Sequence, residues 1–362
     1  MNKTILFIGA FLLVSQSLTA QFFSQSDVWP EGGDMRYTRY HVYGLAVATD
    51  GTILAFSEGR LKPGDADPHD IILKRSKDMG RTWSATQILL KSKHGTCYAN
   101  PTPVVDKKTG NIILFYANNH NNEYSDVYCM VSKDNGITWR NRKKVTSLFD
   151  SDSLKRPFHL PGPGHGLTLS NGVLMMQIWH RYSIKLPLEE RRAGISVIYS
   201  KDHGKTWMAG GFVPTPISIG ESRLVELPDG RVLIECRSNY RINGKIKRVI
   251  AYSRDYGVSW SQPTFNTIPP FTSVDAGLNI LNKQNKNYLL YSRPLGPGRR
   301  NLAISISEDN GFSWPYTRLV HQGSAGYSDV AVLPDQSILV LYGGWSPVSV
   351  TAARFDLAWI KQ

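Results

Sequence analysis

Five segments of alternating apolar and polar residues each lead into the same turn. They are DIILKRS (70–76), DVYCMVS (126–132), ISVIYS (195–200), RVIAYS (248–253) and NLAISIS (301–307). The pattern S-x-D-x-G-x-[ST]-W follows, with copies that begin at Ser76, Ser132, Ser200, Ser253 and Ser307. Alternation with a period of two predicts a strand, and Asp-x-Gly predicts a tight turn. The Asp carboxylate can accept backbone N–H groups, Gly supplies a positive φ and Trp packs beneath, so we expect a folding device.

The repeat has a nearly constant period. Successive copies lie 56, 68, 53 and 54 residues apart, and the longest interval leaves room for an insertion around HRYSIKLPLEERRAG (180–194). Units of this length with several strands and one turn are typical of propeller blades. The period divides the chain after residue 20 into about six units. We therefore predict an all-β, six-bladed β-propeller over residues 21–362.

The first twenty residues have the pattern of an export signal. Lys3 precedes an apolar run from Ile5 to Val14, which is too short to span a bilayer, and the small residue Ala20 suits the cleavage position. No other segment has the composition of a membrane helix. We predict a signal peptide at 1–20 and a secreted or periplasmic protein.

The net charge and the cysteine content limit the kinds of binding partner and cofactor that we expect. The net charge of +13 suggests a polyanionic partner, such as an acidic polysaccharide. No basic aromatic platform is present, so we do not expect nucleic-acid binding. Cys97, Cys129 and Cys236 form an odd set without metal-ligand spacing, and a Cys97–Cys129 disulfide stays open. We expect a monomer with no metal or cofactor.

The turns resemble the Asp-boxes, or BNR repeats, of the sialidase superfamily, and the resemblance covers nearly the whole chain after residue 20. LAVATDGTILAFSEGR (45–60) is similar to the first blade of bacterial exo-sialidases. GESRLVELPDGRVLIECRSN (220–239) and GSAGYSDVAVLPDQSILVLYGG (323–344) are similar to the segments with the family's supporting glutamate and nucleophile. The resemblance implies that Tyr327 is the nucleophile and that Glu221 polarises it. It implies an acid/base role for Asp65, with Asp67 as the alternative.

The same resemblance assigns carboxylate binding to arginines and reveals one departure. Arg237 and Arg299 match two members of the family's arginine triad, with Arg300 as the alternative to Arg299. The first arginine of the triad is replaced, because the family's Tyr-Arg-Ile-Pro reads here as the segment YHVY (40–43), which places His41 at the arginine position. We count Arg60 and Tyr43, in the same region of the chain, among the candidate substrate-binding residues.

These residue types also indicate a chemistry by themselves. Two arginines can clamp a carboxylate, a tyrosine beside a carboxylate can act as nucleophile or base, and histidine titrates near neutral pH. Losing one charge-assisted partner costs about 1.5–3 kcal/mol, which disfavours ordinary sialidase activity. We predict an exported, exo-acting lyase or dehydratase that eliminates the C4 substituent of a non-reducing-end uronic acid in acidic, ulvan-like oligosaccharides, whether sulfated or not.

In this prediction Arg237 and Arg299 hold the carboxylate, and Tyr327 or His41 removes the C5 proton. Asp65 or His165 assists the leaving group. Two alternatives remain open: a retaining exo-sialidase-type hydrolase that uses Tyr327 as nucleophile, and a glycan-binding propeller without catalysis.

Overall fold

The computed structural model describes residues 22–33, 36–267, 272–344 and 348–362. The predicted signal peptide lies outside these residues. Twenty-seven strands account for most of the described structure. One short α-helix, α1 (Leu357–Ile360), and two 3-10 turns, η1 (Thr146–Phe149) and η2 (Leu188–Arg191), complete it. In the described residues no helix has the length and apolar character needed to cross a membrane.

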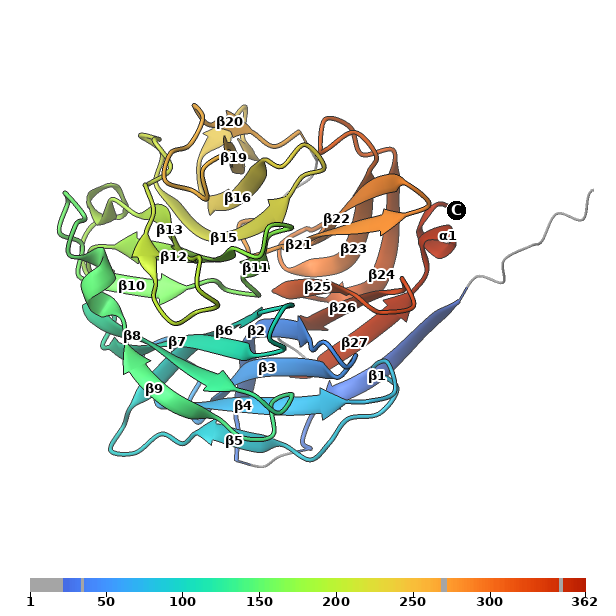
Figure 1. Cartoon of the computed structure of the whole chain (residues 1–362), viewed down its shortest axis with the longest axis horizontal. Coiled ribbons are helices and arrows are strands. Elements are labelled where there is room, and N and C mark those ends of the chain that lie inside the picture. The colour runs from blue at the N-terminus through green and yellow to red at the C-terminus, as the bar shows by residue number, and fades with distance from the viewer. Residues whose placement is uncertain (1–21, 34–35, 268–271, 345–347) are drawn as a thin grey trace, which may run out of the picture.

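The strands form antiparallel meanders arranged around a centre (Figure 1). The first contains β2 (Arg39–Val47), β3 (Ile53–Arg60), β4 (His69–Ser76) and β5 (Gln87–Leu90). The second contains β6 (Cys97–Val105), β7 (Ile112–His120), β8 (Tyr124–Ser132) and β9 (Arg140–Lys144). The third contains β10 (Phe158–Pro161), β11 (Leu167–Thr168), β12 (Leu174–Arg181), β13 (Gly194–Ser200) and β14 (Met208–Ala209).

Three more meanders complete the ring. The fourth contains β15 (Ile219–Glu226), β16 (Val232–Ser238), β19 (Val249–Ser253) and β20 (Thr264–Phe265), with a separate hairpin of β17 (Arg241–Ile242) and β18 (Lys245–Ile246). The fifth contains β21 (Gly277–Lys283), β22 (Lys286–Pro294), β23 (Arg300–Ser307) and β24 (Tyr316–Ser324). The last contains β25 (Ser328–Val332), β26 (Ile338–Gly343) and β27 (Val350–Phe355), and β1 (Phe23–Trp29) pairs with β27.

The predicted all-β propeller is confirmed. Four blades are separate sheets, whereas the first two meanders form one eight-stranded sheet. A single parallel bridge between His69 and Cys97 joins these two meanders, so the predicted number of six is reached only when this sheet is divided there. Because β1 comes from the start of the chain and β27 from its end, their pairing closes the ring.

The Asp-box turns have the local structure predicted for them. In the second copy, Asp134 accepts hydrogen bonds from the backbone N–H of Thr138 at 2.9 Å and from its hydroxyl at 2.6 Å. These bonds lower the pKa of Asp134 to about 2. Gly136 has φ +81°, and a Cβ there would lie 2.3 Å from Leu54 Cδ2 of the neighbouring meander. The turn therefore needs glycine both for its backbone conformation and for close packing.

A buried ion pair lies where the fourth blade meets the fifth. Arg248 donates two hydrogen bonds to the Glu235 carboxylate, and both residues are 1% exposed. The Tyr291 hydroxyl, from the next blade, donates to the same carboxylate at 2.9 Å. All three cysteines are buried free thiols, so a Cys97–Cys129 disulfide is not formed.

Candidate active site

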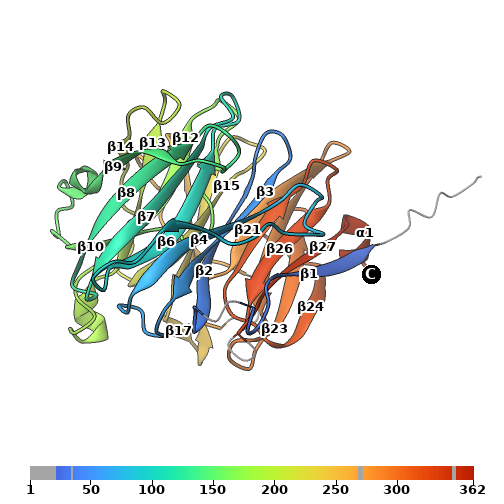
Figure 2. The same cartoon turned by 90° about the horizontal axis from the view of Figure 1, so that it is seen from below.

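A cavity of about 440 Å³ lies at one end of the propeller centre. It is lined by residues near the start of inner strands, such as His41 of β2, and by residues at or just after the end of the strands that pair with them, such as Arg60 of β3. Figure 2 shows the β17–β18 hairpin projecting beyond the blade strands, and this hairpin follows the cavity residues Ser238 and Asn239. The charged residues of the wall are five arginines and three carboxylates, namely Arg60, Arg181, Arg191, Arg237 and Arg299 with Glu58, Asp65 and Glu221. The wall therefore has an excess of positive charge suited to an acidic ligand.

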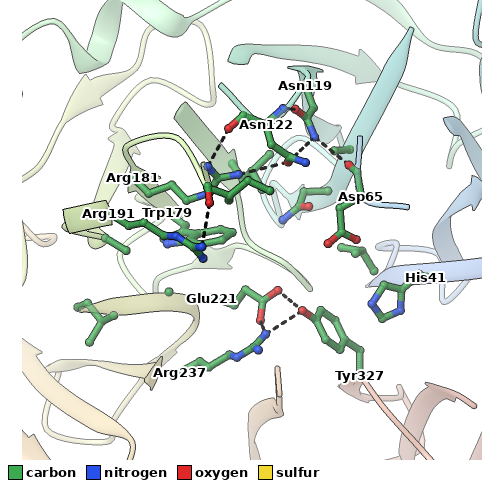
Figure 3. Close-up of a pocket in the computed structure, with 18 of the residues that line it drawn as sticks. His41, Asp65, Asn119, Asn122, Trp179, Arg181, Arg191, Glu221, Arg237 and Tyr327 are labelled. Atoms are coloured by element: carbon green, nitrogen blue, oxygen red, sulfur yellow. Dashed lines mark hydrogen bonds and ion pairs between the residues drawn. The ribbon is translucent and has the colours of Figure 1, made fainter. Parts of the chain in front are cut away.

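Tyr327, Glu221 and Arg237 form one hydrogen-bonded group in the cavity (Figure 3). The Tyr327 hydroxyl donates to one Glu221 oxygen, and Arg237 Nη1 donates to the other. Arg237 Nη1 also lies 3.0 Å from the Tyr327 hydroxyl. Tyr327 directly precedes β25, while Glu221 and Arg237 come from the paired strands β15 and β16, so the fold unites distant segments. The arrangement gives a phenol, a base for its proton and a cation beside both.

The protonation of this group follows from burial and from its charged neighbours. Burial and the nearby Glu221 carboxylate raise the pKa of Tyr327 well above its usual value. Burial opposes the charge of Arg237, but the Glu221 carboxylate outweighs this, and the pKa of Arg237 is raised. The resting state is therefore a neutral phenol, with the Glu221 carboxylate in position to accept its proton.

His41 and Arg299 lie next to the Tyr327 ring. The ring centroids of His41 and Tyr327 are 4.4 Å apart, and the Arg299 guanidinium carbon is 5.4 Å from the Tyr327 centroid. Burial, followed by the charges of Arg60 and Arg299, lowers the pKa of His41 well below its usual value. His41 is therefore a neutral imidazole at neutral pH. It replaces an arginine in position but not in charge.

Asp65 stands at the cavity mouth. Its carboxylate forms an ion pair with Arg60 Nη1 at 2.7 Å, and its side chain is 77% exposed. Arg60 also binds Glu58 at 2.7 Å, so this candidate substrate-binding residue is engaged by two carboxylates and orients Asp65. Asp67 instead accepts the Gly64 N–H at 2.7 Å within its own turn. Of the two aspartates considered for acid/base chemistry, only Asp65 lines the cavity.

Arg299 lines the cavity and Arg300 does not. Arg300 is exposed at the start of β23, where it pairs with Ser324. Both arginines proposed to bind a carboxylate, Arg237 and Arg299, therefore lie beside Tyr327.

Tyr43 is a correction, because its side chain lies in the core and not in the cavity. Its hydroxyl donates to the Tyr40 carbonyl at 3.1 Å, and the residue is 2% exposed. The cause is a bulge in β2 between His41 and Gly44, where Val42 has φ +55°. An irregular residue breaks the alternation of a strand, so His41 and Tyr43 no longer share a face.

His165 is a second correction. It lines a separate depression together with Lys107, Lys108 and the last residues of β2 and β25, at the opposite end of these strands from the cavity. Its Nδ1 lies 2.9 Å from Asp329 Oδ1, and this contact helps to lower the pKa of Asp329 against the effect of burial. His165 therefore cannot assist a leaving group beside Tyr327.

The sequence did not indicate the opposite wall of the cavity. Trp179 and Arg181 of β12 and Arg191 of η2 form this wall, across from His41 (Figure 3). Asn122 accepts from Arg181 Nη1 through its carbonyl at 3.0 Å. Asn119 donates to the Asp65 carbonyl at 2.9 Å and to the Asn122 side chain at 3.0 Å, which links this wall to the Asp65 loop. Arg191 lies in the insertion that the long repeat interval indicates. That interval is the one sequence feature that points to this wall.

A family model described as a BNR repeat-like domain matches residues 51–340. The chain belongs to the sialidase superfamily. Over 374 residues it is 29% identical to a sialidase of Micromonospora viridifaciens, an alignment that covers 91% of this chain and 55% of that protein. A sialidase of Bacteroides fragilis is 28% identical over 344 residues, or 86% of this chain and 61% of that one.

The solved structures agree with this membership. The Hadza microbial sialidase Hz136 superposes with a TM-score of 0.82 at 25% identity, over 93% of this chain and 69% of that one. The chain spans less than two thirds of the length of the two bacterial relatives. The sialidase superfamily predicted from the Asp-boxes is confirmed, and with it the reading of the five turns as BNR repeats.

Proposed function

We propose that the protein is a retaining exo-glycosidase that removes a terminal sugar with a carboxylate on its anomeric carbon, such as a sialic acid. The observation that carries this proposal is the Tyr327 hydroxyl donating to Glu221 while Arg237 binds both. A propeller that only binds glycans has no need of a phenol paired with a base. The sialidase relatives favour this hydrolase over the elimination predicted from the sequence.

The first step forms a covalent bond to Tyr327. Arg237 and Arg299 bind the substrate carboxylate and place the anomeric carbon above the phenol oxygen. Glu221 takes the phenol proton, the oxygen attacks the anomeric carbon, and the glycosidic C–O bond breaks. Asp65, in its protonated form, gives its proton to the departing oxygen, so the aglycone leaves as a neutral alcohol. Arg237 stabilises the phenolate while its negative charge is developing.

The second step releases the sugar. Asp65, now a carboxylate, takes a proton from water, and the water oxygen attacks the anomeric carbon. The bond to Tyr327 breaks, and the phenol recovers its proton from Glu221. Two displacements at one carbon retain its configuration. The exposed position of Asp65 at the mouth suits a group that must meet both aglycone and water.

A second candidate reaction is β-elimination from a uronic acid, and the neutral His41 favours it. An unprotonated imidazole in contact with the Tyr327 ring can accept a proton, while the two arginines acidify the C5 proton by binding the carboxylate. The C5–H electron pair becomes the C4–C5 double bond, and the C4 oxygen leaves with a proton from Asp65. The product is an unsaturated uronate with conjugation that absorbs in the ultraviolet.

The test is a product assay with fluorogenic sialosides and uronate oligosaccharides. Release of the phenol and of a free sugar with retained configuration, abolished in Tyr327→Phe, supports the glycosidase. Loss of water or formation of a conjugated double bond, without hydrolysis, would favour elimination instead. Saturable binding of the same glycans without any product would reject both reactions.

A further inference from the structure

Arg181 is a buried charge that lacks a carboxylate partner among the described residues. It ends β12, is 3% exposed and lines the cavity. Its guanidinium donates only to neutral groups: the carbonyls of Asn122 at 3.0 Å and Tyr182 at 2.9 Å, and the Asn122 side chain at 3.3 Å. Arg181 Nε has no hydrogen-bond partner in the described part of the chain. Buried charges in proteins are normally paired, so this one calls for an anion.

Stacking holds the Arg181 side chain in place. Its guanidinium carbon lies 3.5 Å from the Phe158 ring centroid and 5.4 Å from that of Trp179. Such stacking fixes the plane of the group without neutralising its charge. Burial and the charge of Arg191 lower the pKa of Arg181 to about 9, which leaves the side chain protonated at neutral pH. The cation is thus pre-positioned and still uncompensated.

Arg191 adds a second cation to the same wall. Its Nε donates to the Leu186 carbonyl at 3.0 Å and its Nη2 to the Ile184 carbonyl at 2.8 Å, so its bonds too are to neutral groups. Figure 3 shows Arg181, Arg191 and Trp179 gathered on one side of the cavity, with His41 and Tyr327 on the other. Two neighbouring cations repel each other, and an anion between them would relieve that repulsion.

Among the described residues, no cavity carboxylate forms an ion pair with Arg181 or Arg191, although Asp65 attracts Arg181 at longer range. Glu58 and Asp65 are ion-paired with Arg60, and Glu221 is ion-paired with Arg237. These are the three carboxylates that line the cavity among the described residues. The charge on the far wall must therefore be met by the ligand.

We propose that Arg181 and Arg191 form a second anion-binding subsite, which takes a sulfate ester on the same terminal acidic sugar. The inference rests on the proposed function for the sugar that occupies the cavity. Guanidinium groups match the oxygens of a sulfate, and a sulfate ester stays charged at any physiological pH. A neutral substituent, such as a hydroxyl or an amide, would leave both cations without a counter-ion.

Calorimetry with matched ligands tests the subsite directly. The full chain is titrated with N-acetylneuraminic acid and glucuronic acid, and with the singly O-sulfated isomers of each. At least one isomer should bind about ten- to a hundred-fold more tightly than its parent, the gain expected from charge-assisted hydrogen bonds. If no isomer in either series gains more than about three-fold, the subsite is rejected.

Variants locate the effect. Arg191→Gln should reduce the preference for sulfate to within about three-fold, because it weakens binding of the sulfated isomer far more than binding of the unsulfated sugar. Arg192→Gln is the matched control, because Arg192 is exposed, adjacent in the chain and absent from the cavity wall. Arg181→Lys, which keeps the charge of the buried side chain, should retain part of the preference. A preference for sulfate that survives in Arg191→Gln contradicts the assignment.

The same ligands separate this inference from the proposed function. If sulfate preference depends on Arg191 but no ligand or glycoside is turned over, the subsite stands and the glycosidase proposal fails. If unsulfated sialosides are hydrolysed and sulfation changes KM by less than about three-fold, the glycosidase stands and the subsite fails.

Discussion

Glu221→Gln separates proton transfer from binding in the cavity. The amide has nearly the shape of the carboxylate, but it has no negative charge and is not a base. Two contacts change: the Tyr327 phenol loses the base that can take its proton, and Arg237 loses its ion-pair partner. The account predicts a large fall in kcat. It does not predict a rise in KM, because Arg237 becomes more available to the substrate carboxylate.

The size of the effect follows from these roles. Removing a general base costs about 10²- to 10⁴-fold in rate, which corresponds to about 3–5 kcal/mol of barrier height. The free energy of unfolding should also fall, by about 1–3 kcal/mol, since Arg237 stays largely buried with a weaker partner. A lower kcat with an equal or lower KM indicates a group that acts in the transition state.

The assay is steady-state hydrolysis of a fluorogenic sialoside at neutral pH, with chemical denaturation for stability. Glu226→Gln is the matched control, because Glu226 lies at the other end of β15 and accepts hydrogen bonds from Ser170. It should have wild-type kcat and KM. A Glu221→Gln enzyme that keeps its kcat within about three-fold would refute the idea that Tyr327 needs this base.

Three further perturbations extend the account. Asp65→Asn should lower kcat/KM, which reports the first step, by about 10²- to 10⁴-fold for glycosides with a sugar aglycone and much less for a glycoside of an activated phenol. Equal losses of kcat/KM for both would exclude Asp65 as the acid. Glu235→Ala should lower the free energy of unfolding by about 3–5 kcal/mol, because the buried Arg248 loses its carboxylate partner. A change below about 1 kcal/mol in chemical denaturation would contradict this. His159 has its pKa lowered to about 4 by burial, and its Nδ1 lies 2.8 Å from that of His180. The unfolded chain therefore binds the proton first, and on the order of 3 kcal/mol of stability is lost as pH falls from about 6.5 to 4; His159→Asn should flatten that slope in pH-dependent denaturation.

The sequence predicted those features that a short segment determines alone. Each Asp-box contains its own acceptor, glycine and tryptophan, so the repeat and the propeller could be inferred without contacts between blades. Tyr327, Glu221 and Arg237 could be inferred by resemblance, because each lies in a segment close to the family pattern. Their hydrogen-bonded geometry depends on the fold, which brings the residue before β25 to the paired strands β15 and β16 from a distant part of the chain.

The errors have local physical causes. Tyr43 is counted among the substrate-binding candidates from its place beside His41 in the sequence. Regular alternation would put both side chains on one face of the strand, and the bulge at Val42, with its positive φ, breaks that relation. His165 follows Gly164, whose N–H donates to the Tyr43 carbonyl at 3.1 Å. The sequence does not indicate toward which end of the inner strands the His165 side chain lies. Arg191 lies in an insertion without a counterpart in the repeat, so only the fold could place it beside Arg181.

The most direct measurement is the mass of the protein after reaction with a sialosyl fluoride that has a second fluorine beside the anomeric carbon. That fluorine slows both formation and hydrolysis of the intermediate, whereas the anomeric fluoride is a good leaving group and speeds formation, so the intermediate accumulates. The account predicts one added glycosyl group, located on Tyr327 by peptide mapping and absent in Tyr327→Phe. Turnover of sialosides without any adduct, or an adduct on another residue such as Glu221, would contradict it.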